Sequence, residues 1–118
     1  MAESMSMVKI AYKALDDKLA EDITVIDISK VSVLADYFMI ASGANINQVQ
    51  AIADEVMEKM ERAGYPMRQI EGYDAAAWIL MDYSDVVIHV FSRDDRRFYD
   101  LERIWRDGAI IDMTQYGD

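Results

Sequence analysis

The chain has 118 residues, of which 53% are apolar, with five glycines and one proline, a composition typical of one packed domain spanning residues 1–118. It contains no cysteine, so disulfides, thiol nucleophiles and cysteine-ligated zinc are excluded. The 22 acidic residues outnumber the 12 lysines and arginines, and the resulting net charge of −10 disfavours direct binding to a nucleic-acid backbone.

The N-terminal residues and the hydropathy of the chain indicate a compartment. Residues Met1–Lys9 show neither the basic region and apolar run of a signal peptide nor the arginine-rich character of a transit peptide. No apolar stretch approaches the ~20 residues that a membrane-spanning helix needs. We therefore expect a cytoplasmic protein with no membrane partner.

The first third of the chain predicts one helix followed by two strands. Apolar residues at steps of three and four, ending at Leu19, predict an amphipathic helix over Met7–Asp22. The β-branched segment Ile23–Ile28 predicts a short strand. The nearly continuous apolar run Tyr37–Ala41 predicts a strand that is buried on both faces and therefore central in a sheet.

A second amphipathic helix is predicted after this strand. Asn45 and Gln48 have the spacing of a capping box at a helix N-terminus. An apolar stripe runs from Ile46 to Met60, and Gly64 ends the helix.

The second half of the chain predicts further strands and a third helix. Met67–Ile70 is a weak strand, and only four residues separate the strands Ala77–Met81 and Val86–Phe91, so these two form an antiparallel hairpin. The strand, helix and strand that precede the hairpin predict a right-handed crossover between parallel neighbours. Arg93–Trp105 predicts a helix, and Ala109–Asp112 a last strand or ordered tail. The predicted fold is α/β, with a mixed sheet of about five strands flanked by helices.

The residues that could support catalysis are few. His89 is the only histidine and lies in an apolar strand, so we favour a structural or interface role over that of a base. Without a second histidine or a cysteine, a transition-metal site would need carboxylates alone beside it, which is an unlikely ligand set. Ser42-Gly43 between a strand and a helix is only a weak signal for anion binding. Asp100 and Glu102 fall on a predicted helix, where residues two apart point in different directions, so they form no paired carboxylate site. We predict no catalytic, cofactor-binding or metal-binding residue.

Five arginines and four acidic residues lie between Arg93 and Arg106, leaving a local charge of +1. An ion-paired, solvated helix is the favoured interpretation, and a docking surface is the alternative.

Four blocks of sequence occur in order with short gaps: Asp36–Gly43, Glu71-Gly72, Trp78–Phe91 and Arg96–Trp105. Together they resemble the ribosomal silencing factor family, also called the Iojap family, over nearly the whole chain. The resemblance implies a fold similar to that of nucleotidyltransferases without their catalytic carboxylates, and hence a protein that is not an enzyme and uses no cofactor. It also implies binding to the large ribosomal subunit through its fourteenth protein, which blocks joining with the small subunit and represses translation in starvation.

Within these blocks we predict a set of partner-binding residues: Trp78, Asp82, Tyr83, Asp85, His89 and Tyr99. Trp78 and Tyr83 are the expected anchors, because aromatic side chains dominate interface energetics. Tyr83, in the hairpin turn, is expected to be exposed and poorly placed for the core, whereas Trp78 suits the core and the interface equally. For Asp82 and Asp85 the equal alternative is turn chemistry.

Three positions depart from the family pattern. Asn47 stands where many relatives carry arginine, Ala77 where an acidic or small polar residue is common, and Ser84 where glycine is frequent in the hairpin. Ser84 is expected to alter the turn, because glycine adopts a positive φ at little cost. A degenerate nucleotidyltransferase-like enzyme and a homodimeric scaffold stay as alternative functions.

Overall fold

The computed structural model describes residues 2–30, 33, 35–93 and 109–110. Two helices and six strands occur in this part of the chain. Their bounds are α1 Ala2–Asp17, β1 Glu21–Asp27, β2 Tyr37–Gly43, α2 Ile46–Arg62, β3 Gln69–Glu71, β4 Trp78–Asp82, β5 Val86–Ser92 and β6 Ala109–Ile110. The predicted helix at Arg93–Trp105 lies outside the described residues except for Arg93.

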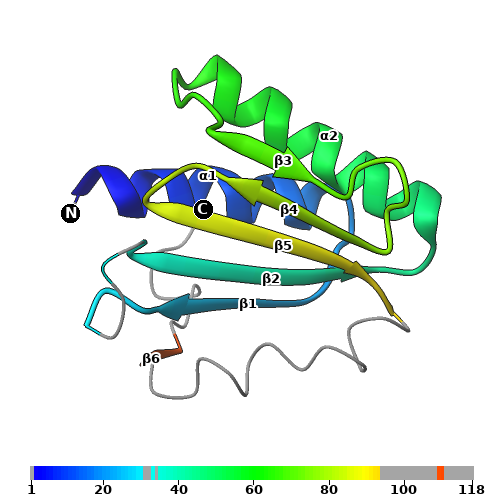
Figure 1. The fold of residues 1–118 in the computed structure, drawn as a ribbon, viewed down its shortest axis with the longest axis horizontal. Coiled ribbons are helices and arrows are strands. Elements are labelled where there is room, and N and C mark those ends of the chain that lie inside the picture. Colours follow the sequence, from blue (N-terminus) through cyan, green and yellow to red (C-terminus); the bar gives the residue numbers. More distant parts are fainter. Residues whose placement is uncertain (1, 31–32, 34, 94–108, 111–118) are drawn as a thin grey trace.

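All six strands form one mixed sheet in the order β3-β4-β5-β2-β1-β6 (Figure 1). The α/β class and the mixed sheet are therefore confirmed, and β6, which pairs with β1 through Ala109 and Ile110, brings the number of strands to six. The prediction that β2 is central is also confirmed, because β1 and β5 flank it.

The prediction that the strands before and after α2 are parallel neighbours is wrong. Among the described strands, β3, which follows α2, lies at the far edge of the sheet and pairs only with β4, and the parallel neighbour of β2 is β5. The antiparallel β4–β5 hairpin, which the sequence predicts, accounts for the difference. Its second strand is seven residues long and mostly buried, so it makes a longer ladder with β2 than the three-residue β3 could.

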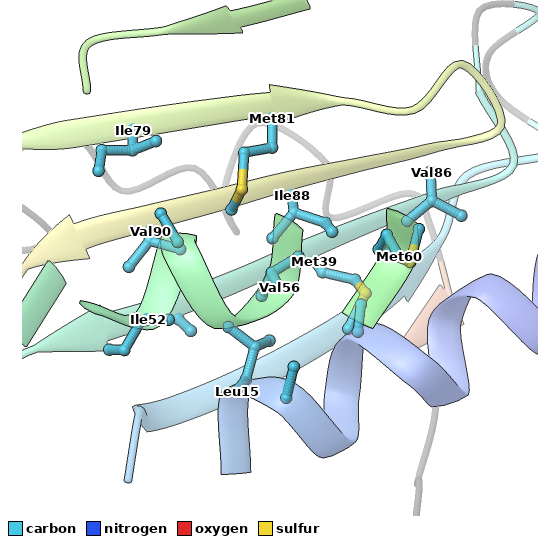
Figure 2. Packing of buried hydrophobic residues seen from close by; sticks show 14 of the residues in the cluster. Leu15, Met39, Ile52, Val56, Met60, Ile79, Met81, Val86, Ile88 and Val90 are labelled. Carbon is cyan, nitrogen blue, oxygen red and sulfur yellow. The ribbon is translucent and has the colours of Figure 1, made fainter. Parts of the chain in front are cut away.

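Both helices pack on the same face of the sheet. Strand alternation sends one set of side chains to that face, including Met39 of β2, Ile79 and Met81 of β4, and Ile88 and Val90 of β5. Figure 2 shows these residues with Leu15 of α1 and with Ile52, Val56 and Met60 of α2. This is the main core, and a smaller cluster that includes Ile26, Ile40 and Phe91 lies on the opposite face.

Helix α1 begins and ends about five residues earlier than predicted. Its last residue is Asp17, and Leu19, expected on the buried stripe, is 77% exposed with φ +60°. The side-chain amide of Gln48 in α2 donates to the carbonyl oxygens of Lys18 and Leu19, both at 3.2 Å. A side chain from a distant part of the chain therefore supplies the hydrogen bonds that the carbonyl groups just after α1 need. The local sequence pattern does not reveal this contact.

Helix α2 follows its sequence signals closely. The Asn45 side chain accepts from the Gln48 backbone N–H at 2.9 Å, and Gly64, with φ +87°, follows the C-cap. The Gln48 side-chain oxygen accepts from the N–H of Ala44 at 2.6 Å, one residue before the N-cap. Ile46 is the exception on the predicted apolar stripe, because it is exposed in the first turn.

Neither helix in the described part of the chain is long and apolar enough to cross a membrane.

Candidate partner-binding face

The sheet face opposite the helices presents a group of half-buried apolar side chains beside the β4–β5 hairpin. Strand register sets their positions, since Val87 of β5 lies opposite Phe38 of β2 on one side and Asp82 of β4 on the other, and His89 lies opposite Leu80. We call the surface formed by Phe38, Trp78, Leu80, Val87 and His89 the hairpin face. Phe38, Trp78, Leu80 and Val87 are all partly accessible to solvent, which suits an interaction surface.

Trp78 is held on the hairpin face by two neighbours. Its indole N–H donates to Nδ1 of His89 at 2.9 Å, and its ring stacks on Phe91 with a centroid distance of 5.1 Å and an interplanar angle of 23°. Trp78 is half-buried and packs against the smaller hydrophobic cluster. It therefore contributes to packing and also presents part of its ring to solvent.

His89 is 3% exposed and lies beneath this surface, with its ring centroid 4.5 Å from that of Phe38. Burial lowers the pKa of His89 to about 4, so the imidazole is neutral near pH 7. Because Nδ1 accepts from Trp78, Nε2 carries the hydrogen, and it has no hydrogen-bond partner within the described part of the chain. His89 thus orients Trp78 and keeps one unused donor, an arrangement that favours the structural or interface role over that of a base.

A groove of about 300 Å³ includes four of the five residues of the hairpin face and extends from β3 across β4 to the first halves of β2 and β5. Its floor is mostly apolar, and charged residues of β3, β4 and the segment before β3 stand at its rim. The residues that line it are Ile28, Ala35, Phe38, Arg68, Gln69, Glu71, Leu80, Asp82, Val87 and His89. Glu71 and Arg68 line this groove although no sequence pattern marked them as site residues, because only the pairing of β3 with β4 brings them there.

The two predicted aspartates of the hairpin both serve the local fold. Asp82 accepts from the Ser84 N–H through Oδ1 at 2.8 Å, and its Oδ2 lies 3.7 Å from the Arg68 guanidinium. The carbonyl of Asp85 accepts from the N–H groups of Asp36 and Tyr37, at 2.8 and 3.1 Å, while its side chain is exposed. Asp82 lines the groove, and Asp85 lies in the turn at the end of the hairpin.

Tyr83 is placed differently from the prediction. It is 4% exposed and belongs to the main core with Ile79 and Met81, on the helix side of the sheet. Burial, and secondarily the charge of Glu61, raises the pKa of Tyr83 to about 12. The expectation that it is exposed is wrong, because strand alternation continues one residue beyond β4 and turns Tyr83 away from Trp78. Tyr99 lies outside the described residues.

Ser84 occupies the strained position of the hairpin turn, with φ +73°. This is the left-handed region, which costs residues with a Cβ about 1 kcal/mol or more. We expect Ser84→Gly to raise the free energy of unfolding by up to about 1 kcal/mol, since relief of strain exceeds the added backbone entropy of glycine. Urea denaturation of both proteins measures this, and an unchanged or lower midpoint would contradict it.

The described residues contain no group of three His, Asp or Glu side chains placed to hold a metal ion.

Arg93, the first of the clustered arginines, pairs with Glu21 of β1, and its Nε lies 2.9 Å from the carboxylate. This contact agrees with an ion-paired interpretation at that residue. Two departures from the family pattern, Asn47 and Ala77, line one groove with Arg93 beside the start of α2. This groove shares no lining residue with the groove at the hairpin face.

Comparison with known proteins gives consistent matches. The family model described as "ribosomal silencing factor during starvation" matches residues 1–117. The chain is 45% identical over 108 residues to ribosomal silencing factor RsfS of Bacillus subtilis, covering 92% of each chain. A mouse protein named mitochondrial assembly of ribosomal large subunit protein 1 is 32% identical over 89 residues, which is 73% of this chain and 39% of the mouse protein. A crystal structure of a Chromobacterium violaceum protein superposes with a TM-score of 0.84 at 36% identity, covering 86% of this chain and 84% of that one.

Proposed function

Because the chain belongs to the ribosomal silencing factor family, whose names denote a regulatory factor and not an enzyme, we propose that it represses translation by binding the large ribosomal subunit. Binding through the fourteenth protein of that subunit blocks joining with the small subunit. The name of the mouse relative refers to the large subunit, which favours this subunit as the partner.

The observation that carries the proposal is the hairpin face. It combines a partly exposed indole, fixed by His89 and Phe91, with the neighbouring apolar side chains Phe38 and Leu80. Rigid aromatic groups of this kind supply most of the binding energy in protein interfaces. The net charge of −10 adds electrostatic steering toward basic ribosomal proteins and opposes loose adsorption on ribosomal RNA.

Steric exclusion is sufficient for the proposed mechanism. The domain measures 33 × 32 × 27 Å along its principal axes. A body of this size on the joining surface holds the subunits far beyond the ~3 Å at which hydrogen bonds form between them. Repression then needs no chemical change in either subunit.

The direct test is a subunit-joining experiment. Separated subunits are mixed with the protein in molar excess and resolved on sucrose gradients, and we expect fewer joined ribosomes than without it. Subunits that are afterwards freed of the protein by a high-salt wash should rejoin at full yield, because nothing has been modified. Undiminished joining in the presence of the protein contradicts silencing, and a loss that survives the wash points to an enzyme.

Trp78→Ala should weaken binding to the large subunit by about 2 kcal/mol or more, which is roughly a 30-fold rise in Kd. Some stability is lost as well, because the indole stacks on Phe91 and donates to His89. Co-sedimentation with large subunits and thermal melts on the same preparation separate the two effects. Trp78→Phe is the matched control for the lost hydrogen bond, and a folded Trp78→Ala protein that binds at full strength removes the hairpin face from the interface.

A further inference from the structure

We propose that the groove at the hairpin face binds an extended, positively charged segment of the protein partner, with a basic side chain at Glu71 and an uncharged acceptor, such as a main-chain carbonyl, at Nε2–H of His89. This inference rests on the proposed function and deepens it, because it names the chemistry that the docking protein must present.

The size of the groove suits one or two residues of a peptide. Its volume of about 300 Å³ is at the lower end of the range for small-molecule sites, which run to ~1,000 Å³. Its floor includes Phe38, Leu80 and Val87, which are partly accessible and can cover the aliphatic stem of a lysine or arginine side chain. A long basic side chain lying over this floor keeps its charged end at the rim.

The charges at the rim favour a cation. Arg68 and Asp82 face each other at 3.7 Å and largely neutralise one another. Glu71 is exposed, and its carboxylate accepts from the neutral amide of Gln69 at 2.9 Å, with no cation paired to it in the described part of the chain. The rim therefore keeps one uncompensated negative charge, within a chain that is acidic as a whole.

His89 supplies the second observation. A buried donor without a partner is rare in native proteins, and Nε2 of His89 is such a donor, within the described residues, on a side chain that lines the groove. The neighbouring carboxylates of Glu71 and Asp82 repel an anion, so the acceptor that fits is uncharged. A peptide segment offers such an acceptor, its carbonyl oxygen, next to a basic side chain.

The test measures binding of charge-reversal variants to purified large subunits by co-sedimentation. Glu71→Lys is expected to weaken binding by ~10-fold or more, as close interfacial charge pairs do. Glu58→Lys is the matched control, because Glu58 is exposed on α2 on the other side of the sheet and its replacement changes the net charge equally. It should bind within about twofold of the unaltered chain, as expected for a charge outside the interface.

His89→Asn probes the donor separately. The asparagine side-chain oxygen can still accept from the Trp78 indole, but nothing occupies the position of Nε2, so we expect weaker binding in a protein that still folds. A thermal melt on each variant confirms the fold before binding is measured. If His89→Asn does not fold, Leu80→Arg, which fills a partly exposed position in the groove, tests whether the groove itself is occupied. Full-strength binding by folded His89→Asn overturns the role of the donor, and full-strength binding by folded Leu80→Arg overturns the role of the groove.

The outcomes separate the inference from the function it rests on. If the unaltered chain does not bind large subunits, the proposed function fails and the inference fails with it. If the unaltered chain binds and Glu71→Lys binds equally well, or Glu58→Lys is weakened to the same extent, only the inference is overturned. If Glu71→Lys changes self-association in sedimentation velocity and leaves subunit binding intact, the occupant is a second copy of this chain, which also overturns it.

Discussion

Tyr83→Ala should lower the free energy of unfolding by about 3–5 kcal/mol, the usual cost of truncating a buried aromatic side chain. Tyr83 is 4% exposed and packs in the main core, so its removal leaves a cavity that the sheet and α2 can close only in part. Urea or thermal denaturation measures the loss. This loss is a large part of the total free energy of unfolding of so small a domain, so the variant should be partly unfolded near 37 °C.

Tyr83→Phe is the control for this substitution. It keeps the ring in the core and removes only the hydroxyl, so we expect near-normal stability. Because Tyr83 faces the helices and Trp78 faces the other way, Tyr83→Phe should also bind the large subunit at full strength. A Tyr83→Ala protein with a normal melting temperature would show that the side chain is not packed in the core.

Gly72→Ala should destabilise the protein by about 2–5 kcal/mol, through backbone strain and steric overlap together. Gly72 directly follows β3 and has a backbone φ of +78°, which residues with a Cβ rarely adopt. A Cβ at this position would lie 2.2 Å from the carbonyl oxygen of Trp78, so the backbone at the start of β4 would have to move. The same shift would disturb the position of Trp78, and subunit binding should weaken as well.

Gly64→Ala is the matched control, because Gly64 also has a positive φ, +87°, but a Cβ added there would meet no atom of the described residues within 4 Å. It should lose only the strain component, about 1–2 kcal/mol. Comparing the two denaturation curves isolates the contribution of the close approach to Trp78. Equal losses for the two variants would contradict the steric argument.

Part of the candidate site can be predicted from residue types. Both Trp78 and His89 are predicted in this way, but the hydrogen bond between them is visible only in the structure. Glu71 enters only as part of a family block, since its place at the groove depends on the pairing of β3 with β4. Tyr83 is expected at the surface because hairpin turns are usually exposed, whereas here alternation beyond β4 carries it into the core.

Elements with local signals are predictable from the order of residues. Helix α2 is specified by Asn45, Gln48 and Gly64 at its ends, and the β4–β5 hairpin by two apolar runs with a short turn between them. Such signals act over a few residues, so they can be recognised without knowledge of the rest of the chain. Three other features are visible only in the folded protein: where α1 ends, which edge of the sheet receives β3 and which side chains share the groove. Each of these depends on contacts between residues far apart in sequence, such as Gln48 with Leu19, whose free energy no local pattern encodes.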